Sequence, residues 1–294
     1  MAKYLGKDMS INRNTGNYAS PAWAFLRAAK DIKLNLEAIE FDTSDRGSDG
    51  DTTTPSRYKC SVDFDAIWDG GTGLTALRTA FLAGSSIELA VLDQTATNSG
   101  WGVRGEWAVT AFPLDMPLND GQKLKIQLQL HGQYTNAPAF YTDATSSAGT
   151  AETAGTKKKG KDAVVCNSSG TAMTVIRDFK FSVEPAALFN ADDRASLFEL
   201  VIPTRRKYMA ELNAIWQPGN THLAAFKTAF LNRTAIELFM LDGPYATSGS
   251  WGLHGDWMVS KFPIDAKLNA GQDIKIELKP HGAYSTAVTE YTVS

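Results

Sequence analysis

The chain has 294 residues, of which 43% are hydrophobic, and a net charge of −3, which is typical of a globular protein with about two domains. The slight excess of acidic residues excludes a chain-wide basic field for nucleic-acid binding, and two cysteines are too few for a disulfide framework. No stretch approaches the roughly 18 apolar residues of a membrane span, and the first residues lack the apolar core of a signal peptide. We therefore expect a protein made in a cytosol, with no membrane partner.

Apolar and polar residues alternate with a period of two through much of the first half. The alternation covers residues 32–36, 58–64 and 124–130, and such half-buried strands are typical of antiparallel sheets with one wet face. Residues 87–92 and 107–112 are more continuously apolar and predict central strands. This half of the chain is therefore expected to be rich in antiparallel strands.

One helix stands out between these strands. Leu74, Leu77 and Phe81 share a helical face at spacings i, i+3 and i+7, and the same stripe recurs over residues 223–230. One helix against antiparallel strands predicts the α+β class, mostly β: a β-sandwich domain with one flanking helix.

The second half of the chain repeats the first. TAFLAGSSIELAVLD at 79–93 corresponds to TAFLNRTAIELFMLD at 228–242, and WGVRGEW at 101–107 corresponds to WGLHGDW at 251–257. A period near 150 residues is far too long for a solenoid. The chain is therefore a duplicated domain, and we call the two halves the first and second copy.

The two copies are separated by a stretch rich in Ser, Thr, Ala, Gly and Lys. We expect a first domain at 1–141, a linker at 142–159 and a second domain at 160–294. The linker has no apolar period, which is typical of a flexible tether.

No motif in the chain predicts catalysis or a bound cofactor. Residues 155–162 fit the first seven positions of a P-loop, but Asp162 stands where Ser or Thr would bind Mg²⁺. Residues 42–51 resemble a calcium loop, but Gly47 falls on a ligand position and no Glu closes the site. The four histidines lack metal-site spacing. We expect no enzyme, no cofactor and no metal.

The two copies differ most in one loop. Residues 42–51 are acidic, whereas the corresponding residues 192–203 are apolar. An apolar loop is costly to leave in water, so we expect it to pack against a partner; the alternative is that it extends a strand into its own domain. The residues expected at an assembly interface are Asp45, Arg46, Asp193, Arg194, Leu197, Phe198, Leu200 and Ile202.

The order of motifs within each copy resembles a known family. The strand DIKLNLE at 31–37 is followed by SDRGS at 44–48, a strand leading to Trp68, the segment 75–93 and a G-x-W-x-V-T-x-F strand beginning at Gly105. A final P-L-N-D-G strand completes the set. Together these motifs resemble the major tail tube proteins of long-tailed bacteriophages, once per copy.

The resemblance implies a structural virion protein, assembled in the host cytoplasm. Its domains would join side by side into six-membered rings, and the rings would stack into a hollow tail tube through which double-stranded DNA passes without specific binding. Two domains per chain then imply a homotrimer with pseudo-hexameric rings. Implied partners are further copies of the chain, the tape measure protein and the tail terminator.

Two alternatives remain open. The inner tube of a contractile or tailocin-like injection system shares the expected fold. A tandem carbohydrate-binding or adhesin β-sandwich protein would be monomeric with exposed tryptophan platforms.

Overall fold

The computed structural model describes residues 9–42, 53–94, 100–142, 150–185, 187–191, 196–217, 219–265 and 273–294. The chain forms two compact units. Unit 1 comprises Met1–Phe112, Lys125–Thr156 and Pro185–Arg206, and unit 2 comprises Pro113–Leu124, Lys157–Glu184 and Lys207–Ser294.

Each unit contains a short segment of the other copy. We call Pro113–Leu124, which belongs to unit 2, the first-copy segment, and Pro185–Arg206, which belongs to unit 1, the second-copy segment. The units differ from the contiguous domains expected at 1–141 and 160–294 by these two exchanged segments.

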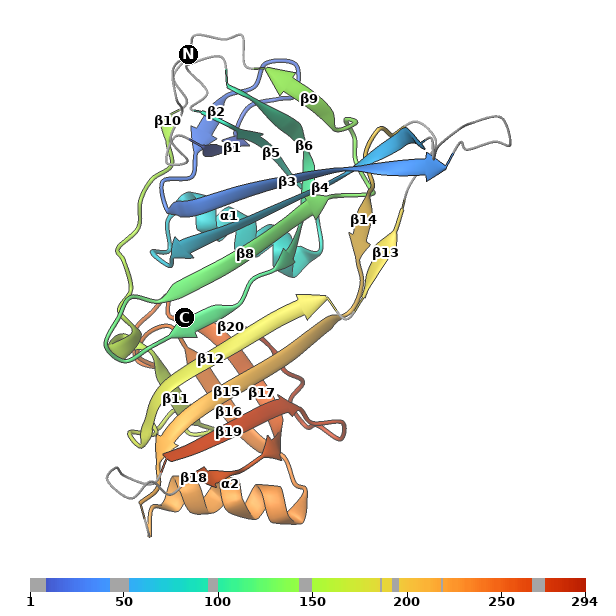
Figure 1. Ribbon diagram of the computed structural model, residues 1–294. Helices are drawn as coiled ribbons and strands as arrows, with labels where there is room; N and C mark the ends of the chain where they lie inside the picture. The colour runs from blue at the N-terminus through green and yellow to red at the C-terminus, as the bar shows by residue number, and fades with distance from the viewer. Residues whose placement is uncertain are drawn as a thin grey trace. The chain divides into compact units, whose positions relative to one another are not determined.

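Unit 1 is built almost entirely from antiparallel strands (Figure 1). Its elements are β1 (Ser10–Asn14), β2 (Trp23–Phe25), β3 (Ala29–Asp42), β4 (Thr53–Ile67), α1 (Thr72–Ala83), β5 (Ile87–Leu92), β6 (Trp101–Ala111), β8 (Lys123–Leu130, with its first two residues in unit 2), β9 (Ala139–Thr142), β10 (Thr150–Ala151), β13 (Leu188–Asn190) and β14 (Val201–Pro203). The long pair β3–β4 continues into β8, and β5 pairs with β1 and β6.

The alternating sequence pattern corresponds to burial in unit 1. Along β8, Ile126 and Leu128 are fully buried while Lys125 and Gln127 between them are exposed. Successive side chains of a strand point to opposite faces of the sheet, so the apolar set meets the core and the polar set meets water.

The helix α1 completes the core of unit 1. Leu74, Leu77 and Phe81 are buried on one face, as their spacing predicted, and burying each such side chain stabilises the fold by about 1.5–3 kcal/mol. Phe112 lies between Phe81, with ring centroids 5.9 Å apart, and Trp68, at 6.1 Å. The helix ends at Gly84, which adopts φ 65°, a left-handed conformation that glycine takes without strain.

Unit 2 repeats this plan. Its elements are β7 (Leu114–Met116), the 3₁₀ turn η2 (Gly160–Asp162), β11 (Val164–Asn167), β12 (Ile176–Pro185, with its last residue in unit 1), β15 (Arg206–Ile215, with its first residue in unit 1), α2 (Thr221–Asn232), β16 (Ile236–Leu241), β17 (Trp251–Lys261), β18 (Ile264–Asp265), β19 (Asp273–Pro280) and β20 (Thr289–Thr292). β12, β15 and β19 are the counterparts of β3, β4 and β8. The Asn220 side chain caps α2 by accepting hydrogen bonds from two backbone N–H groups.

The predicted fold class is confirmed: the protein is mostly β, with one α-helix in each copy. Neither described helix is long and apolar enough to cross a membrane.

Candidate assembly surfaces

The second-copy segment packs against first-copy strands within unit 1. Tyr58 N donates a hydrogen bond of 2.8 Å to the Leu197 carbonyl, and Glu199 N donates one of 2.9 Å to the Tyr58 carbonyl. Phe198 stands between these two bonded residues in the chain. Its ring is fully buried, and the ring centroid lies 5.2 Å from that of Phe140 and 6.1 Å from that of Tyr58. The segment is therefore held by a backbone ladder with an aromatic side chain at its centre.

A second contact of this segment depends on a glycine. Gly132 N donates a hydrogen bond of 2.9 Å to the Val201 carbonyl. A Cβ at Gly132 would lie only 2.3 Å from the Cβ of Ala191, so this close approach of two backbones requires glycine. The neighbouring His131 is 2% exposed.

These contacts involve two of the residues expected at an assembly interface, and the expected interface itself stays a prediction. Phe198 and Leu200 are fully buried inside unit 1, so the partner of this loop is the first copy of the same chain. Leu197 stays 59% exposed, and Ile202 is partly buried. The other expected residues, Asp45, Arg46, Asp193 and Arg194, lie outside the described residues.

The first-copy segment adds a strand to β12 within unit 2. β7 pairs with β12 in antiparallel register, placing Met116 opposite Phe179, Asp115 opposite Lys180 and Leu114 opposite Phe181. The four apolar residues of these pairs are buried, whereas the aspartate and the lysine are exposed. The added strand therefore covers an apolar edge.

The described part of the expected linker is anchored at both ends. In unit 1 the buried Glu152 carboxylate accepts hydrogen bonds from Arg13 Nε, at 2.7 Å, and from the Thr72 hydroxyl. In unit 2 Lys158 Nζ lies 2.7 Å from the fully buried Asp242 carboxylate. Residues 150–159 therefore do not behave as a free tether; residues 143–149 lie outside the described residues.

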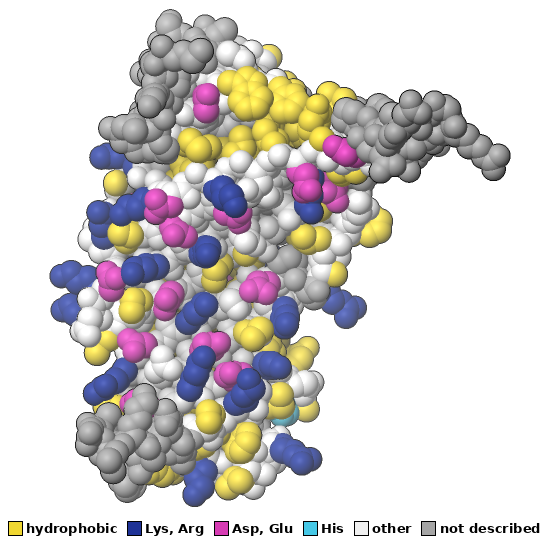
Figure 2. Space-filling model, viewed as in Figure 1, with side chains coloured by type: hydrophobic (Ala, Val, Ile, Leu, Met, Phe, Trp, Pro, Cys, Tyr) yellow, Lys and Arg dark blue, Asp and Glu magenta, His cyan; other side chains and the backbone are white. Residues whose placement is uncertain are grey.

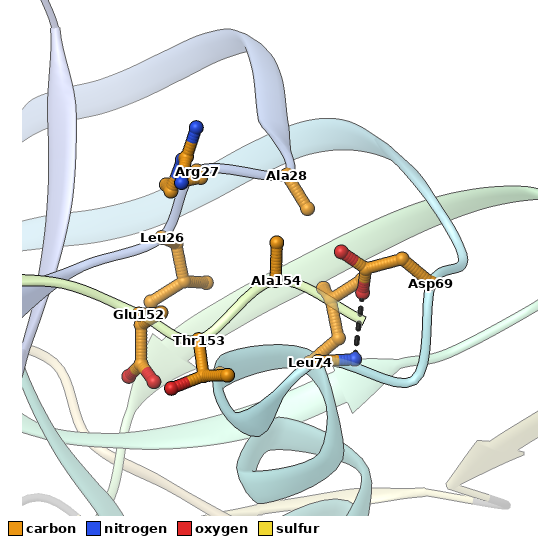
Figure 3. A pocket seen from close by; sticks show the side chains of 10 residues that line it. Leu26, Arg27, Ala28, Asp69, Leu74, Glu152, Thr153 and Ala154 are labelled. Atoms are coloured by element: carbon orange, nitrogen blue, oxygen red, sulfur yellow. Dashed lines mark hydrogen bonds between the residues drawn. The ribbon is translucent and has the colours of Figure 1, made fainter. Parts of the chain in front are cut away.

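Figure 3 shows Glu152, Thr153 and Ala154 lying beside the start of α1, close to Leu26 and Leu74. The cavity among them is about 10 Å³, which is room for about one water molecule. This part of unit 1 is a packing site for the chain itself and not a ligand pocket.

In the second copy, none of the described residues covers the surface that corresponds to the Gly132 contact. Gly282, the counterpart of Gly132, has nothing within 4 Å of a Cβ built on it, and His281 is partly exposed where His131 is buried. The second copy therefore presents the same site without its occupant.

The two helices show the same difference. Phe81 is 7% exposed because Arg206 of the second-copy segment covers it, with the guanidinium 6.0 Å from the ring centroid and one N–H bonded to the Phe81 carbonyl at 3.3 Å. Phe230, its counterpart on α2, is 39% exposed, so only part of the apolar stripe predicted for this helix is buried.

An aromatic patch lies beside the second-copy segment in unit 1. Figure 2 shows hydrophobic side chains gathered over β6 and β9; here Trp101, 46% exposed, stacks on Phe140 with centroids 5.8 Å apart. The counterpart Trp251 is 2% exposed and donates a hydrogen bond to Glu290. The first copy thus presents an exposed aromatic pair, whereas the second copy buries the corresponding tryptophan and bonds it to an exposed glutamate.

No arrangement of described side chains indicates chemistry. No group of three or more His, Cys, Asp or Glu residues in the described ranges could hold a metal ion. A hollow of about 410 Å³ in unit 2 is lined mainly by β11, β12 and the residues between them, together with Leu118. Among the described residues, the surfaces that distinguish the two copies are packing surfaces of strand edges and apolar side chains, which are typical of a structural protein.

The family comparison agrees with this class. Residues 6–136, which lie within the first copy, match the phage tail tube protein family. The resemblance predicted from the sequence motifs is confirmed: the chain resembles a phage tail tube protein. No curated protein matches the chain.

Three solved structures are similar to parts of the chain. A chain of the native gene transfer agent virion has 11% identity and a TM-score of 0.37, covering 46% of this chain and 98% of its own length. A chain of the tail of an empty gene transfer agent particle has 15% identity and a TM-score of 0.39, with coverages of 47% and 98%. The SPP1 tail tube has 11% identity and a TM-score of 0.34, with coverages of 62% and 77%.

Proposed function

We propose that this chain is the structural subunit of a phage tail tube and that three chains close into a ring of six copies. The observation that carries the proposal is the exchange of segments between copies. Each copy covers a surface of the other, whereas the counterparts of the covered surfaces, at Gly282 and Phe230 in the second copy, are left open.

Open surfaces on the second copy, whose counterparts on the first copy are covered, favour head-to-tail association. A heterologous contact repeated by rotation closes a ring, and one that does not close gives a filament. The family resemblance implies six positions per ring, and two copies per chain fill them with three chains. The ring is therefore a homotrimer with pseudo-sixfold symmetry.

Stacked rings of this kind form the hollow tube that conducts double-stranded DNA. A net charge of −3 suits a conduit, because each Lys or Arg bound to phosphate adds salt-dependent affinity that would retard transit. The role is structural and not catalytic. The tape measure protein and the tail terminator are the expected partners, and assembly takes place in the host cytoplasm before the tube becomes part of the virion.

Light scattering and negative-stain electron microscopy of the purified chain test the proposal. Since one chain has a mass of 31.9 kDa, three chains give about 96 kDa (3 × 31.9). We expect a species of this mass, or rings and tubes. Monodisperse monomers at high concentration would reject the proposal. Tubes that recruit a sheath would identify the contractile alternative, and glycan binding by a monomer would identify the adhesin alternative.

A further inference from the structure

In unit 1 the linker fills a groove beside β2. β10 pairs in parallel register with β2, and Glu152 N donates a hydrogen bond of 3.1 Å to the Phe25 carbonyl. Glu152, Thr153 and Ala154 then lie close to Leu26 (Figure 3), and the cavity among them is only about 10 Å³. An extended segment of the chain therefore completes this side of the first copy.

The corresponding groove of the second copy is hollow. Its residues 172–174 correspond to residues 25–27, at the offset that relates DIKLNLE at 31–37 to DFKFSVE at 178–184 (178 − 31 = 147). Both triplets show the same order of an exposed, a buried and an exposed side chain, but residues 172–174 line a hollow of about 410 Å³. The second copy therefore has the groove without the segment that fills it in the first copy.

The backbone of Ala172 is directed as the backbone of Phe25 is. Ala172 stands opposite Cys166 of β11, and the hydrogen bonds of this short ladder, at 3.1 Å and 2.8 Å, are made by the residues on either side of the pair. Phe25 stands opposite Asn12 of β1 in the same way. A residue between two such bonds directs its own N–H and C=O groups to the opposite edge. Ala172 therefore offers an added strand the carbonyl that Phe25 gives to Glu152.

The second copy is complete without an occupant in this groove. α1 has no side chain that caps its first turn, and the linker supplies an acceptor, since Thr72 N donates a hydrogen bond of 3.1 Å to the Thr153 carbonyl. α2 is capped by its own Asn220 side chain. The N–H groups at the start of a helix need such acceptors, and α2 has them within its own copy. An occupant of the hollow is therefore separable from the fold, as another molecule is.

The hollow combines apolar and basic lining residues. Met173 and Phe179 are buried apolar side chains. Lys161 and Arg177 bring two positive charges against one aspartate, Asp162, which lies 3.9 Å from Lys161. No described carboxylate forms an ion pair with the exposed Arg177. The charges therefore favour an acidic occupant.

We propose that this hollow binds an extended acidic segment of another protein, which adds a parallel strand along residues 172–174 and places a carboxylate at Arg177. In this mode of recognition main-chain hydrogen bonds give affinity, and pockets for alternate side chains give specificity. The linker of a second copy is not available as the occupant, because β10 is paired within its own unit 1. Since the linker also fills the groove of the first copy, each chain binds one segment and not two.

Fluorescence polarisation with a labelled peptide tests the proposal on the full chain, at a concentration where the chain is monomeric. The probe is TAETAGT, residues 150–156, because this segment fills the corresponding groove of the first copy. A second probe carries Glu152→Lys. TAETAGT should bind saturably with one peptide per chain, and the lysine peptide should bind about tenfold more weakly because its charge meets Arg177.

Two matched variants locate the binding site. Arg177→Glu is the test and Lys30→Glu the control, because Lys30 is the counterpart of Arg177 in the first copy and both side chains are exposed. Arg177→Glu should weaken the binding of TAETAGT about tenfold and reverse the preference between the two peptides. Lys30→Glu should bind TAETAGT as the wild type does. Circular dichroism establishes that both variants are folded, and a photoreactive probe should cross-link to residues 161–179.

Several results would overturn the proposal. They are the absence of saturable binding at millimolar peptide, equal affinity for the two peptides, equal weakening by the two variants, two peptides bound per chain, and cross-links outside residues 161–179. Loss of binding when the chains assemble would show that a second copy fills the hollow, and would overturn it as well. Rings seen by electron microscopy alongside any of these results would leave the proposed function standing.

Discussion

Alanine at Gly132 and at Gly282 should have opposite consequences for the isolated chain and for the assembly. In Gly132→Ala the new Cβ would lie 2.3 Å from Ala191 Cβ and 3.0 Å from Ile202 Cγ1, whereas carbon atoms in good contact are roughly 3.5–4.0 Å apart. The backbones must separate by more than about 1 Å, and overpacking of this kind costs about 1–3 kcal/mol. Gly282→Ala meets nothing within 4 Å, so the free energy of unfolding should stay within about 0.5 kcal/mol or rise slightly.

Guanidinium denaturation at a concentration where the chain is monomeric measures the first effect. The midpoint of Gly132→Ala should fall, and that of Gly282→Ala should match the wild type. In the assembly, Gly282→Ala should be the more damaging of the two variants. If another chain approaches Gly282 as Ala191 approaches Gly132, Gly282→Ala should weaken each contact between chains about five- to 140-fold, for a clash of about 1–3 kcal/mol, and light scattering should show fewer rings.

If Gly282→Ala formed rings as well as the wild type does, the packing around Gly132 would not recur between chains. An equal loss of unfolding free energy in both variants would also contradict this reasoning. Both glycines would then be needed for the local turn and not for the close approach of another segment.

Three further predictions concern the isolated chain. Phe198→Ala should lower the free energy of unfolding of unit 1 by about 3–5 kcal/mol, and Leu197→Ala, at a side chain 59% exposed, by less than about 0.5 kcal/mol; similar denaturation midpoints would contradict the contact. Burial raises the pKa of Cys60 to about 12 and that of Cys166 to about 11. A thiol reagent at pH 8 should therefore label both thiols only after denaturation. The contribution of the two neutral, buried thiols to the free energy of unfolding should be lost as the pH rises above about 9 toward these pKa values. Glu152→Gln, which removes the charge from a buried carboxylate that pairs with a guanidinium, should lower the denaturation midpoint by an amount equivalent to about 1–3 kcal/mol; an unchanged midpoint would show that the anchor contributes nothing.

The strands and helices were largely predictable because their periods report burial directly. Alternation predicted β8, and the spacing of Leu74, Leu77 and Phe81 predicted the buried face of α1. Because the sequence is duplicated, the same patterns predicted the corresponding strand and helix in the second copy. The local pattern was sufficient to predict an element and its buried face wherever that element packs on its own copy.

The exchange of segments was not predictable from the same patterns. The apolar character of residues 192–203 predicted that this loop is covered, but hydrophobic burial is non-directional and does not specify which surface covers it. β7 is three residues long, and nothing in Leu-Asp-Met indicates that it pairs with β12. The anchors Glu152 and Lys158 join residues 139 and 84 positions away, so linker composition could not reveal them.

The exchange within one polypeptide separates two kinds of equilibrium. The contacts of Phe198 with Tyr58 form inside a single molecule and are independent of protein concentration, since linkage turns the second binding event into an intramolecular one. Contacts between chains obey mass action and weaken on dilution. A diluted ring should therefore fall apart into whole chains, and Phe198 should remain buried at every concentration at which the chain is folded.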